Sequence, residues 1–248
     1  YTAWWQKDSK LSAPRNSNLK TVMDFSFFDK INTAKNEETD TWFKGLDRVY
    51  NNFVYDYLYP DPASVLAFIE NHDTDRFLGE GENLNMLKQA STLLLTTRRI
   101  PQLYYGTEVM MNGVKSKSDG YVRKDFPGGW ANDKENALTP EGRTKLQNES
   151  YNFYRNLLNW RKGNDVIAKG SMKQFMVQHG VYAYAREYNG KTVFVLLNGT
   201  DKEVKLPLKY YAEVLKDKTQ GKDVISGKMI MLNEELTMAP RQSMVIEL

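Results

Sequence analysis

Residues 64–77 read SVLAFIENHDTDRF, and the change of character inside this stretch decides the fold assignment. Residues 64–70 are almost continuously apolar, which is typical of a parallel strand that is covered on both faces. A polar run from His72 to Arg76 follows at once. Polar side chains that follow the carboxyl ends of such strands often form active sites. We therefore expect a buried parallel strand over 64–70 and a candidate site directly after it.

Two further apolar runs and two helical patterns flank this strand. Residues 19–25 (LKTVMDF) and 99–106 (RIPQLYYG) are expected strands. Between the three strands, residues 42–57 and 84–94 carry apolar side chains near the helical period. The order strand, helix, strand, helix, strand is that of a parallel sheet or barrel.

A long Gly-containing connection, residues 107–138, follows the third expected strand. Connections of this length in a compact domain are usually functional or mobile. Thr139 and Pro140 are expected to open the next helix as its N-cap and first turn. Gly163 is expected to end that helix.

The sequence changes character again at about residue 168. Short runs rich in Val, Tyr, Phe and Ile follow one another without helices between them, which indicates a small antiparallel sandwich. Asn189-Gly190 between two of these runs predicts a tight hairpin. We expect an α/β part over residues 1–165 and an all-β part, an antiparallel β-sandwich, over residues 166–248.

Composition excludes several classes of protein and site. The 248-residue chain has a formal net charge of +3, which is too small to indicate a nucleic-acid or membrane-surface partner. The sequence has no cysteine, and therefore neither disulfides nor thiolate metal sites. With two histidines and no acidic calcium-loop motif, no metal or other cofactor is expected in this chain.

A second polar cluster strengthens the candidate site. Asp119 and Arg123 (DGYVR) lie in the long connection after the third expected strand, so they could face the same mouth as His72 and Asp73. Taken separately, each cluster has a structural interpretation. The loop after the second strand could be held by salt bridges, and a D-x-x-x-R pair is more often a surface ion pair.

At this point several motifs resemble one family. FIENHD (68–73) resembles the fourth conserved segment of the α-amylase family of glycoside hydrolases. RIPQLYYGTE (99–108) is similar to the eighth barrel strand of that family, and VMDFSF (22–27) to the sixth. DGYVRKDFPGGW (119–130), LLNWRKGNDVIAKG (157–170) and the sandwich resemble the neopullulanase and cyclomaltodextrinase branch. The likeness covers nearly the whole chain.

The resemblance implies strands 6–8 of a (β/α)₈ TIM barrel followed by an antiparallel β-sandwich. It also implies retaining cleavage of α-glucosidic bonds in starch-derived oligosaccharides or cyclodextrins, which needs a nucleophile and a general acid about 5–5.5 Å apart. Asp73 matches the third carboxylate of the family, which stabilises the transition state. His72 matches a residue that binds a glucose hydroxyl, and Asp119 and Arg123 match a pair that holds sugars toward the non-reducing end.

The nucleophile and general acid of the family do not match any part of residues 1–62. The D-x-x-R-x-D pattern and the G-E strand end are both missing there, and Asp24 falls on the expected strand 19–25. We therefore expect the chain to begin after the fifth barrel strand and to be inactive alone. Its expected partners are an α-glucan oligosaccharide and the missing N-terminal half of the barrel, or else a self-associated copy.

Two other functions remain open on the sequence. In the first, the chain is a non-catalytic glucan-binding module in which the sandwich and aromatic residues such as Trp130 stack on sugars. In the second, it is an inactive family member that serves as a scaffold, although His72 and Asp73 are both present. The compartment is not determined by the sequence, and resemblance to starch-using bacterial systems slightly favours a periplasmic or secreted protein.

Overall fold

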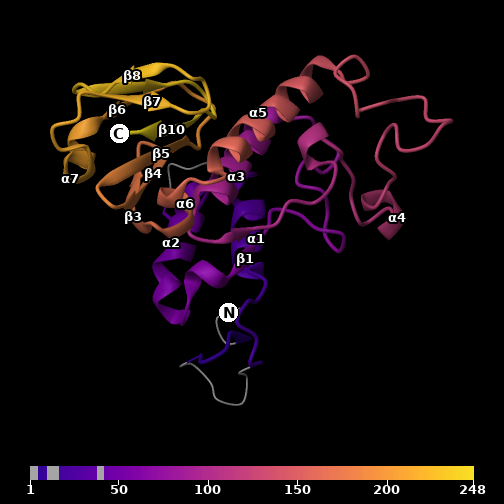
Figure 1. Ribbon diagram of the computed structural model, residues 1–248, viewed down its shortest axis with the longest axis horizontal. Helices are drawn as coiled ribbons and strands as arrows, with labels where there is room; N and C mark the ends of the chain where they lie inside the picture. Colours follow the sequence, from indigo (N-terminus) through magenta and orange to yellow (C-terminus); the bar gives the residue numbers. More distant parts are fainter. Residues whose placement is uncertain (1–4, 10–16, 38–41) are drawn as a thin grey trace.

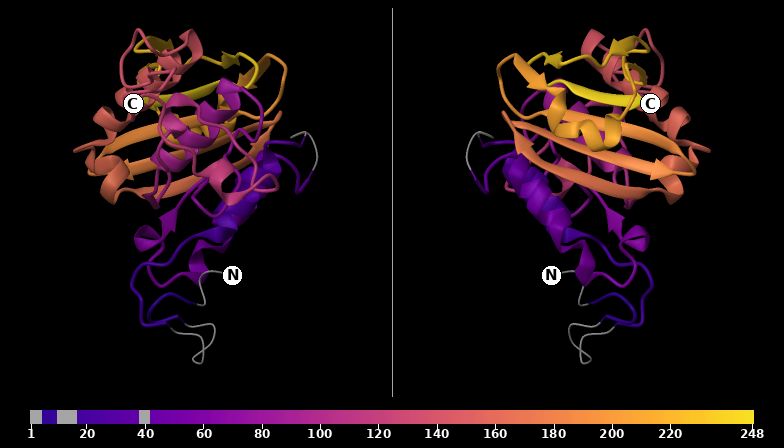
Figure 2. Two further views of the ribbon diagram at one scale, coloured as in Figure 1. Left: turned by 90° about the vertical axis from the view of Figure 1, so that its right-hand side faces the viewer. Right: turned by 90° about the vertical axis from the view of Figure 1, so that its left-hand side faces the viewer.

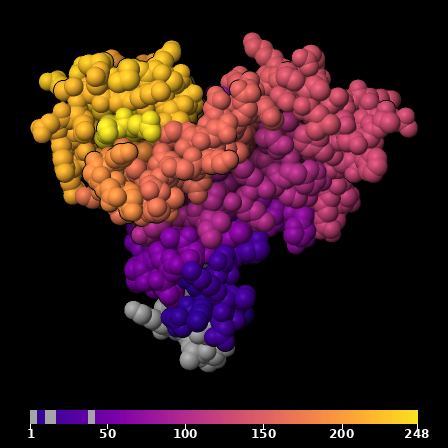
Figure 3. Space-filling view, viewed as in Figure 1, coloured from indigo at the N-terminus to yellow at the C-terminus, as the bar shows by residue number. Residues whose placement is uncertain are grey.

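The computed structural model describes residues 5–9, 17–37 and 42–248. Helices, short parallel strands and long loops make up the chain as far as residue 169, and an antiparallel sheet occupies most of the remainder (Figure 1). The loops from about 107 to 144 form an arm on the side opposite the sheet, which the space-filling view also shows (Figure 3). No helix in these described ranges is long and apolar enough to cross a membrane.

Three parallel segments lie side by side in the helical part. Strands β1 (Leu66–Ala67) and β2 (Ile100–Pro101) pair in parallel, and Met23 forms a parallel bridge with Leu66 on the other side of β1. The Leu66 amide donates to the Val22 carbonyl at 3.0 Å, and the Gln102 amide donates to the Ala67 carbonyl at 2.8 Å. The three expected strands are therefore confirmed as neighbours, in the order 22–24, 65–67, 100–102.

These strands are shorter than the sequence predicted, and the first one ends early. Helix α1 (Phe25–Ala34) begins where the run 19–25 was expected to remain extended. The Asp24 carboxylate accepts a hydrogen bond from the Phe27 amide at 3.0 Å and so caps the helix. Because the Asp24 carboxylate satisfies one of the free amides of the first helical turn, the helix can start directly after Asp24.

Two helices were predicted from apolar periodicity and are confirmed with shorter bounds. The pattern over 42–57 becomes α2 (Leu46–Val54), and Trp42 and Tyr57 at its ends are exposed. The pattern over 84–94 becomes α3 (Leu84–Thr96), whose apolar residues are buried. The remaining α-helices of the described residues are α4 (Asp119–Val122), α5 (Lys145–Arg161), α6 (Asp165–Lys169) and α7 (Ala212–Leu215).

The predicted start of α5 was wrong. Thr139 and Pro140 lie in turns, and the N-cap is Thr144. The Thr144 hydroxyl accepts from the Gln147 amide at 3.2 Å, while the Gln147 side chain accepts from the Thr144 amide at 2.8 Å. Two reciprocal hydrogen bonds satisfy more helix-end donors than a Thr-Pro pair can, so the later start is favoured.

The C-terminal part is an antiparallel sheet with a smaller two-stranded sheet against it. The six-stranded sheet has the order β3-β4-β5-β10-β7-β8, and β6 pairs with β9. This arrangement is consistent with the predicted sandwich. The strands are β3 (Ser171–Gln178), β4 (Val181–Tyr188), β5 (Lys191–Asn198), β6 (Val204–Pro207), β7 (Gln220–Asp223), β8 (Met229–Met231), β9 (Glu235–Met238) and β10 (Ser243–Glu247).

The two faces of the large sheet belong to different hydrophobic cores. Along β4, Tyr182 and Tyr184 are buried in the core that contains α1, α2, α3 and α5. The alternate residues Val181, Ala183 and Ala185 are buried with residues of β6, β9 and α7. Side chains alternate between the faces of a strand, so one strand joins the helical part to the sandwich. Figure 2 shows the sheet standing between the helices and the smaller strands.

A buried arginine also joins the two parts. The Arg186 guanidinium on β4 donates to the carbonyls of Thr96, Ile167, Gly170 and Ser171 at 2.8–3.1 Å. Burial lowers the pKa of Arg186 to about 10, and the positive charges of Arg98 and Arg161 act in the same direction. The carbonyls that it binds lie at the end of α3, in α6 and where α6 passes into β3, and they would otherwise be buried without this donor.

The predicted Asn189-Gly190 hairpin is confirmed between β4 and β5. Both turn residues have positive φ, 48° at Asn189 and 75° at Gly190. We expect Gly190→Ala to reduce the free energy of unfolding by about 1 kcal/mol, because the left-handed region disfavours a Cβ. A Cβ at Gly190 would meet no atom within 4 Å, so only the backbone cost should be measured in urea unfolding.

Gly120 supplies the matched control for this prediction. It lies in α4, and a Cβ there would meet only the Ser118 hydroxyl at 3.8 Å. Gly120→Ala should leave stability unchanged or raise it slightly. If Gly190→Ala and Gly120→Ala reduced the free energy of unfolding equally, the left-handed conformation of Gly190 would not be the cause of the loss.

Candidate active site

The site begins with a tight turn directly after β1. The buried Asn71 side chain accepts from the Asp73 amide at 2.8 Å, and the Thr74 hydroxyl accepts from the Asn71 amide at 3.0 Å. An asparagine that closes such a turn reverses the chain within a few residues. As a result the side chains of His72 and Asp73 project outward, 61% and 58% exposed.

Arg76 holds this turn against the long loop that follows β2. Its buried side chain donates to the Val122 carbonyl at 3.0 Å and to the Tyr105 carbonyl at 2.6 Å, and it lies over the Tyr104 ring at 4.0 Å. The Arg76 amide also donates to the Gly113 carbonyl at 3.0 Å. These contacts give Arg76 a structural role in the turn.

Glu70 lies beneath the turn and completes this support. It is 2% exposed, is paired with Arg76 at 3.3 Å, and accepts from the Thr107 hydroxyl and the Phe77 amide. Burial raises the pKa of the Glu70 carboxyl, and these donors act in the opposite direction. A buried carboxyl is favourable only with such partners, so Glu70 serves to fix the loop and does not face solvent.

The structure brings the four predicted site residues together. Arg123, in the turn that ends α4, donates to the Asp73 carboxylate at 2.9 Å and to the Asp119 carboxylate at 3.2 Å. It also donates to the His72 carbonyl at 2.8 Å. The His72 imidazole lies 3.2 Å from the other Asp73 oxygen. Residues 50 positions apart therefore form one cluster at the mouth of the two loops.

Sequence reasoning missed a fifth member of this cluster, Lys115. Its ammonium donates to the Asp73 carbonyl at 3.0 Å and lies 3.6 Å from the Asp119 carboxylate. The Lys115 amide donates to the Asp75 carboxylate at 2.5 Å. The four-residue spacing to Asp119 is a local signal for this lysine, whereas its contact with Asp73 forms only when two distant loops fold against each other.

The exposure of the cluster defines what it can do chemically. The side chains that form these ion pairs are 40–61% exposed. Exposed ion pairs contribute at most about 1 kcal/mol each, so hydroxyl groups of a ligand can replace them at small cost. The cluster therefore offers carboxylate acceptors and guanidinium, ammonium and imidazole donors in fixed positions. In the described residues no group of three His, Cys, Asp or Glu side chains could hold a metal ion.

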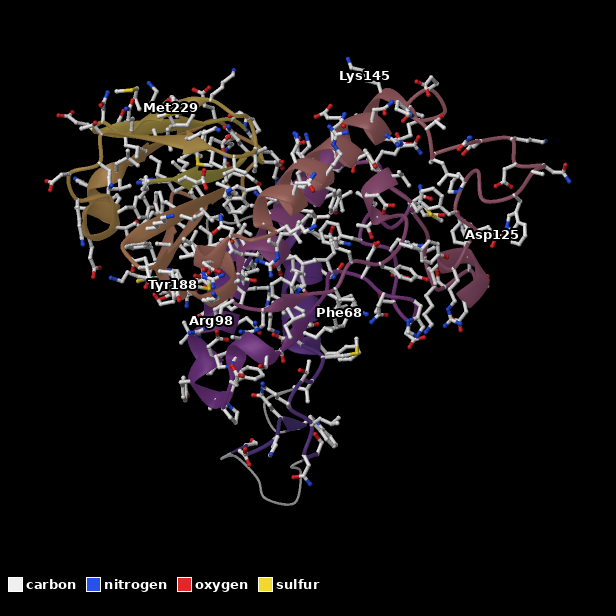
Figure 4. The ribbon with its side chains drawn as sticks, in the orientation of Figure 1. Phe68, Arg98, Asp125, Lys145, Tyr188 and Met229 are labelled. Carbon is white, nitrogen blue, oxygen red and sulfur yellow. The ribbon has the colours of Figure 1, made fainter. Side chains whose placement is uncertain are left out.

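Two other acidic or aromatic residues from the sequence lie elsewhere. Asp24 is fully buried and binds Arg99 at 3.0 Å, so it does not face the cluster. Trp130 is 66% exposed, and its amide donates to the Asp133 carboxylate at 3.1 Å in the long loop. Figure 4 shows Asp125, between Arg123 and Trp130, on the arm and far from Tyr188 and Met229 on the sheet.

Comparison with known proteins gives relatives among the alpha-amylases and the cyclomaltodextrin glucanotransferases. Residues 172–247 match the family model of the cyclo-malto-dextrinase C-terminal domain. The chain is 27% identical over 226 residues to an alpha-amylase of Niallia circulans, covering 88% of this chain and 39% of that protein. It is 31% identical over 183 residues to a cyclomaltodextrin glucanotransferase of Thermoanaerobacterium thermosulfurigenes, covering 74% of this chain and 23% of that protein.

Solved structures show the same likeness at the level of the fold. An Anoxybacillus alpha-amylase superposes with a TM-score of 0.74 at 18% identity, covering 98% of this chain and 50% of that one. An alpha-amylase from Geobacillus thermoleovorans, solved with acarbose, gives a TM-score of 0.71 at 18% identity, covering 92% of this chain and 48% of that one.

The chain spans 39% or less of the length of these two curated relatives. The likeness nevertheless runs through both the helical part with its loops and the sandwich. This chain is thus homologous to the α-amylases and cyclomaltodextrin glucanotransferases, and it carries the C-terminal domain of the cyclomaltodextrinase and α-amylase family.

Proposed function

We propose that this chain is the C-terminal half of a retaining α-glucan hydrolase that acts on starch-derived oligosaccharides or cyclodextrins. In this proposal Asp73 stabilises the transition state, His72 binds a hydroxyl of the glucose at the scissile bond, and Asp119 and Arg123 hold a neighbouring sugar. The observation that carries the proposal is the meeting of these four side chains at one loop mouth.

The chemistry of the cluster supports this assignment. A retaining glycosidase passes through an oxocarbenium-like transition state, which a nearby carboxylate stabilises electrostatically. Asp73 is held from both sides by Arg123 and His72, so little reorganisation is needed when substrate arrives. Lys115 and the Asn71 turn keep its backbone in place.

We further propose that the helical part, residues 1–165, supplies the last three strands of a (β/α)₈ barrel and that residues 166–248 form a separate sandwich domain. The parallel order of segments 22–24, 65–67 and 100–102 supports this. So does an open apolar face beside the first of them. A cavity of 820 Å³ is lined there by the exposed side chains of Leu19, Met23, Phe25 and Phe43.

An upstream segment of the same protein would cover this face and bring the nucleophile and the general acid. Residues 1–62 contain neither motif of the family that carries those two groups. Strand edges and apolar faces of this size are seldom left exposed in isolated proteins. Without that segment, a self-associated copy would be the alternative cover.

Complementation tests the proposal. The 248-residue chain alone should release no reducing sugar from maltoheptaose, because Asp73 by itself cannot perform the double displacement. Coexpression with the coding sequence upstream of Tyr1 should yield a complex that cleaves maltoheptaose. The upstream half expressed alone is the control.

Two outcomes would go against it. Measurable cleavage by the chain alone would show that the missing carboxylates are present after all. A folded complex that binds maltoheptaose without cleaving it would favour the non-catalytic glucan-binding module, for which exposed Trp130 is a candidate stacking residue.

A further inference from the structure

A second cleft lies away from the Asp73 cluster, where Trp42 and Asp47 near the start of α2 lie beside one end of the sandwich. Its volume is 630 Å³, and it is lined by Trp42, Met176, His179, Asp201 and Arg241, among others. The volume lies within the range of small-ligand pockets, about 300–1,000 Å³.

One wall of the cleft presents a carboxylate that is fixed in place. Arg241 donates to the two Asp201 oxygens at 2.7 and 3.2 Å. The Arg241 side chain is 13% exposed and the Asp201 side chain 80% exposed. A two-point pair of this kind orients the carboxylate plane, and the remaining lone pairs of Asp201 are directed to solvent.

The lining of the cleft also contains an aromatic ring. Trp42 is 74% exposed, and Met176 beside the cleft is 49% exposed. Tryptophan is highly buried on average, so an indole this exposed beside a cleft has a face free for a ligand. The His179 imidazole, 6.4 Å from the Tyr210 ring between centroids, adds a third polar group.

The backbone of the cleft is held in a costly conformation. His179 and Arg241 have φ values of 52° and 51°, in the left-handed region that non-glycine residues rarely adopt. Both residues belong to tight turns between strands, His179 to the β3–β4 turn and Arg241 to the β9–β10 turn, and these turns place them at the end of the sandwich. Both of them line this one cleft.

We propose that this cleft is a second binding site for a linear α-glucan, separate from the Asp73 cluster. The C–H face of a glucose ring would stack on Trp42, while its hydroxyls would bond to Asp201 and His179. Asp47, Asp201 and Glu203 outnumber Lys202 and Arg241 among the lining charges, which disfavours phosphate-bearing ligands. The choice of a glucan rests on the proposed function.

Nuclear magnetic resonance tests the site directly. The isotope-labelled chain is titrated with millimolar maltoheptaose, and the Trp42 indole signal is assigned by comparison with Trp42→Phe. We expect shifts of the Trp42 indole and of the His179 and Gly180 amides. Trp42→Ala should weaken binding at the cleft roughly tenfold, since aromatic stacking contributes about 1 kcal/mol or slightly more. Asp201→Asn should weaken it without removing the exposed indole.

This experiment can contradict the second site without contradicting the proposed function. Asp73→Asn should leave the shifts at the cleft unchanged, whereas Trp42→Ala should leave those at residues 72–73 and 119–123 unchanged. Shifts confined to the Asp73 loops would overturn the second site and leave the proposed function standing. No shift at the cleft at saturating maltoheptaose, or an equal response to cellohexaose, would also overturn the second site.

Discussion

Asp73→Asn should lower kcat/KM of the complemented enzyme on maltoheptaose by at least ~100-fold, with most of the loss in kcat. The amide removes the negative charge opposite the oxocarbenium-like transition state and turns one acceptor oxygen into a donor. Because Asp73 is 58% exposed, the change should not unfold the chain. Initial rates of reducing-sugar release, with circular dichroism to check folding, measure the effect.

A matched substitution makes this result specific. Asp165 is equally exposed, pairs with Lys169 within α6 and lies in another element, so Asp165→Asn should retain wild-type turnover. If Asp73→Asn kept near-wild-type turnover, the role given to Asp73 would be wrong. The function of the remaining cluster would then have to be reassigned.

The largest effect on stability is expected from Arg99→Met, at about 3–5 kcal/mol of the free energy of unfolding. Arg99 is fully buried and binds Asp24 at 3.0 Å and Asp56 at 2.5 Å. These two carboxylates raise the pKa of Arg99 despite its burial. Methionine fills the space but leaves Asp24 without its charged partner and Asp56 with only Arg98.

Urea unfolding with a surface control measures this loss. Arg155 is exposed on α5, and Arg155→Met should change the free energy of unfolding by no more than about 0.5 kcal/mol. Adding Asp56→Asn to Arg99→Met should recover part of the loss, because it removes one buried charge. A double variant that is less stable than Arg99→Met would contradict uncompensated charge as the cause.

The parts of the fold that follow from neighbouring residues could be predicted from the sequence. Apolar runs and turn residues indicated the three parallel segments, the helices α2, α3 and α5, and the Asn189-Gly190 hairpin. The start of α5 was less accurate. It was expected at Thr139-Pro140, whereas the reciprocal hydrogen bonds between Thr144 and Gln147 place the N-cap at Thr144.

The residues of the candidate site could also be predicted from the sequence only in part. The FIENHD motif alone indicated His72 and Asp73, and the DGYVR run indicated Asp119 and Arg123. That Arg123 reaches Asp73 could be expected only as a consequence of parallel strands ending at one edge. The contact of Lys115 with the Asp73 carbonyl could not be predicted, because it crosses between loops, whereas its ion pair with Asp119 joins residues only four positions apart.

The sequence by itself determined the features that depend on hydrogen bonds and side-chain periodicity within a few residues. These are the Asn71 turn that presents Asp73, the left-handed hairpin and the amphipathic helices. Only the tertiary structure decided which distant groups meet. It placed Arg99 between Asp24 and Asp56, turned alternate residues of β4 into two separate cores, and brought Arg241 to Asp201 beside Trp42. Local bonds form at small entropic cost, whereas contacts between distant residues form only when the whole core has closed the intervening loops.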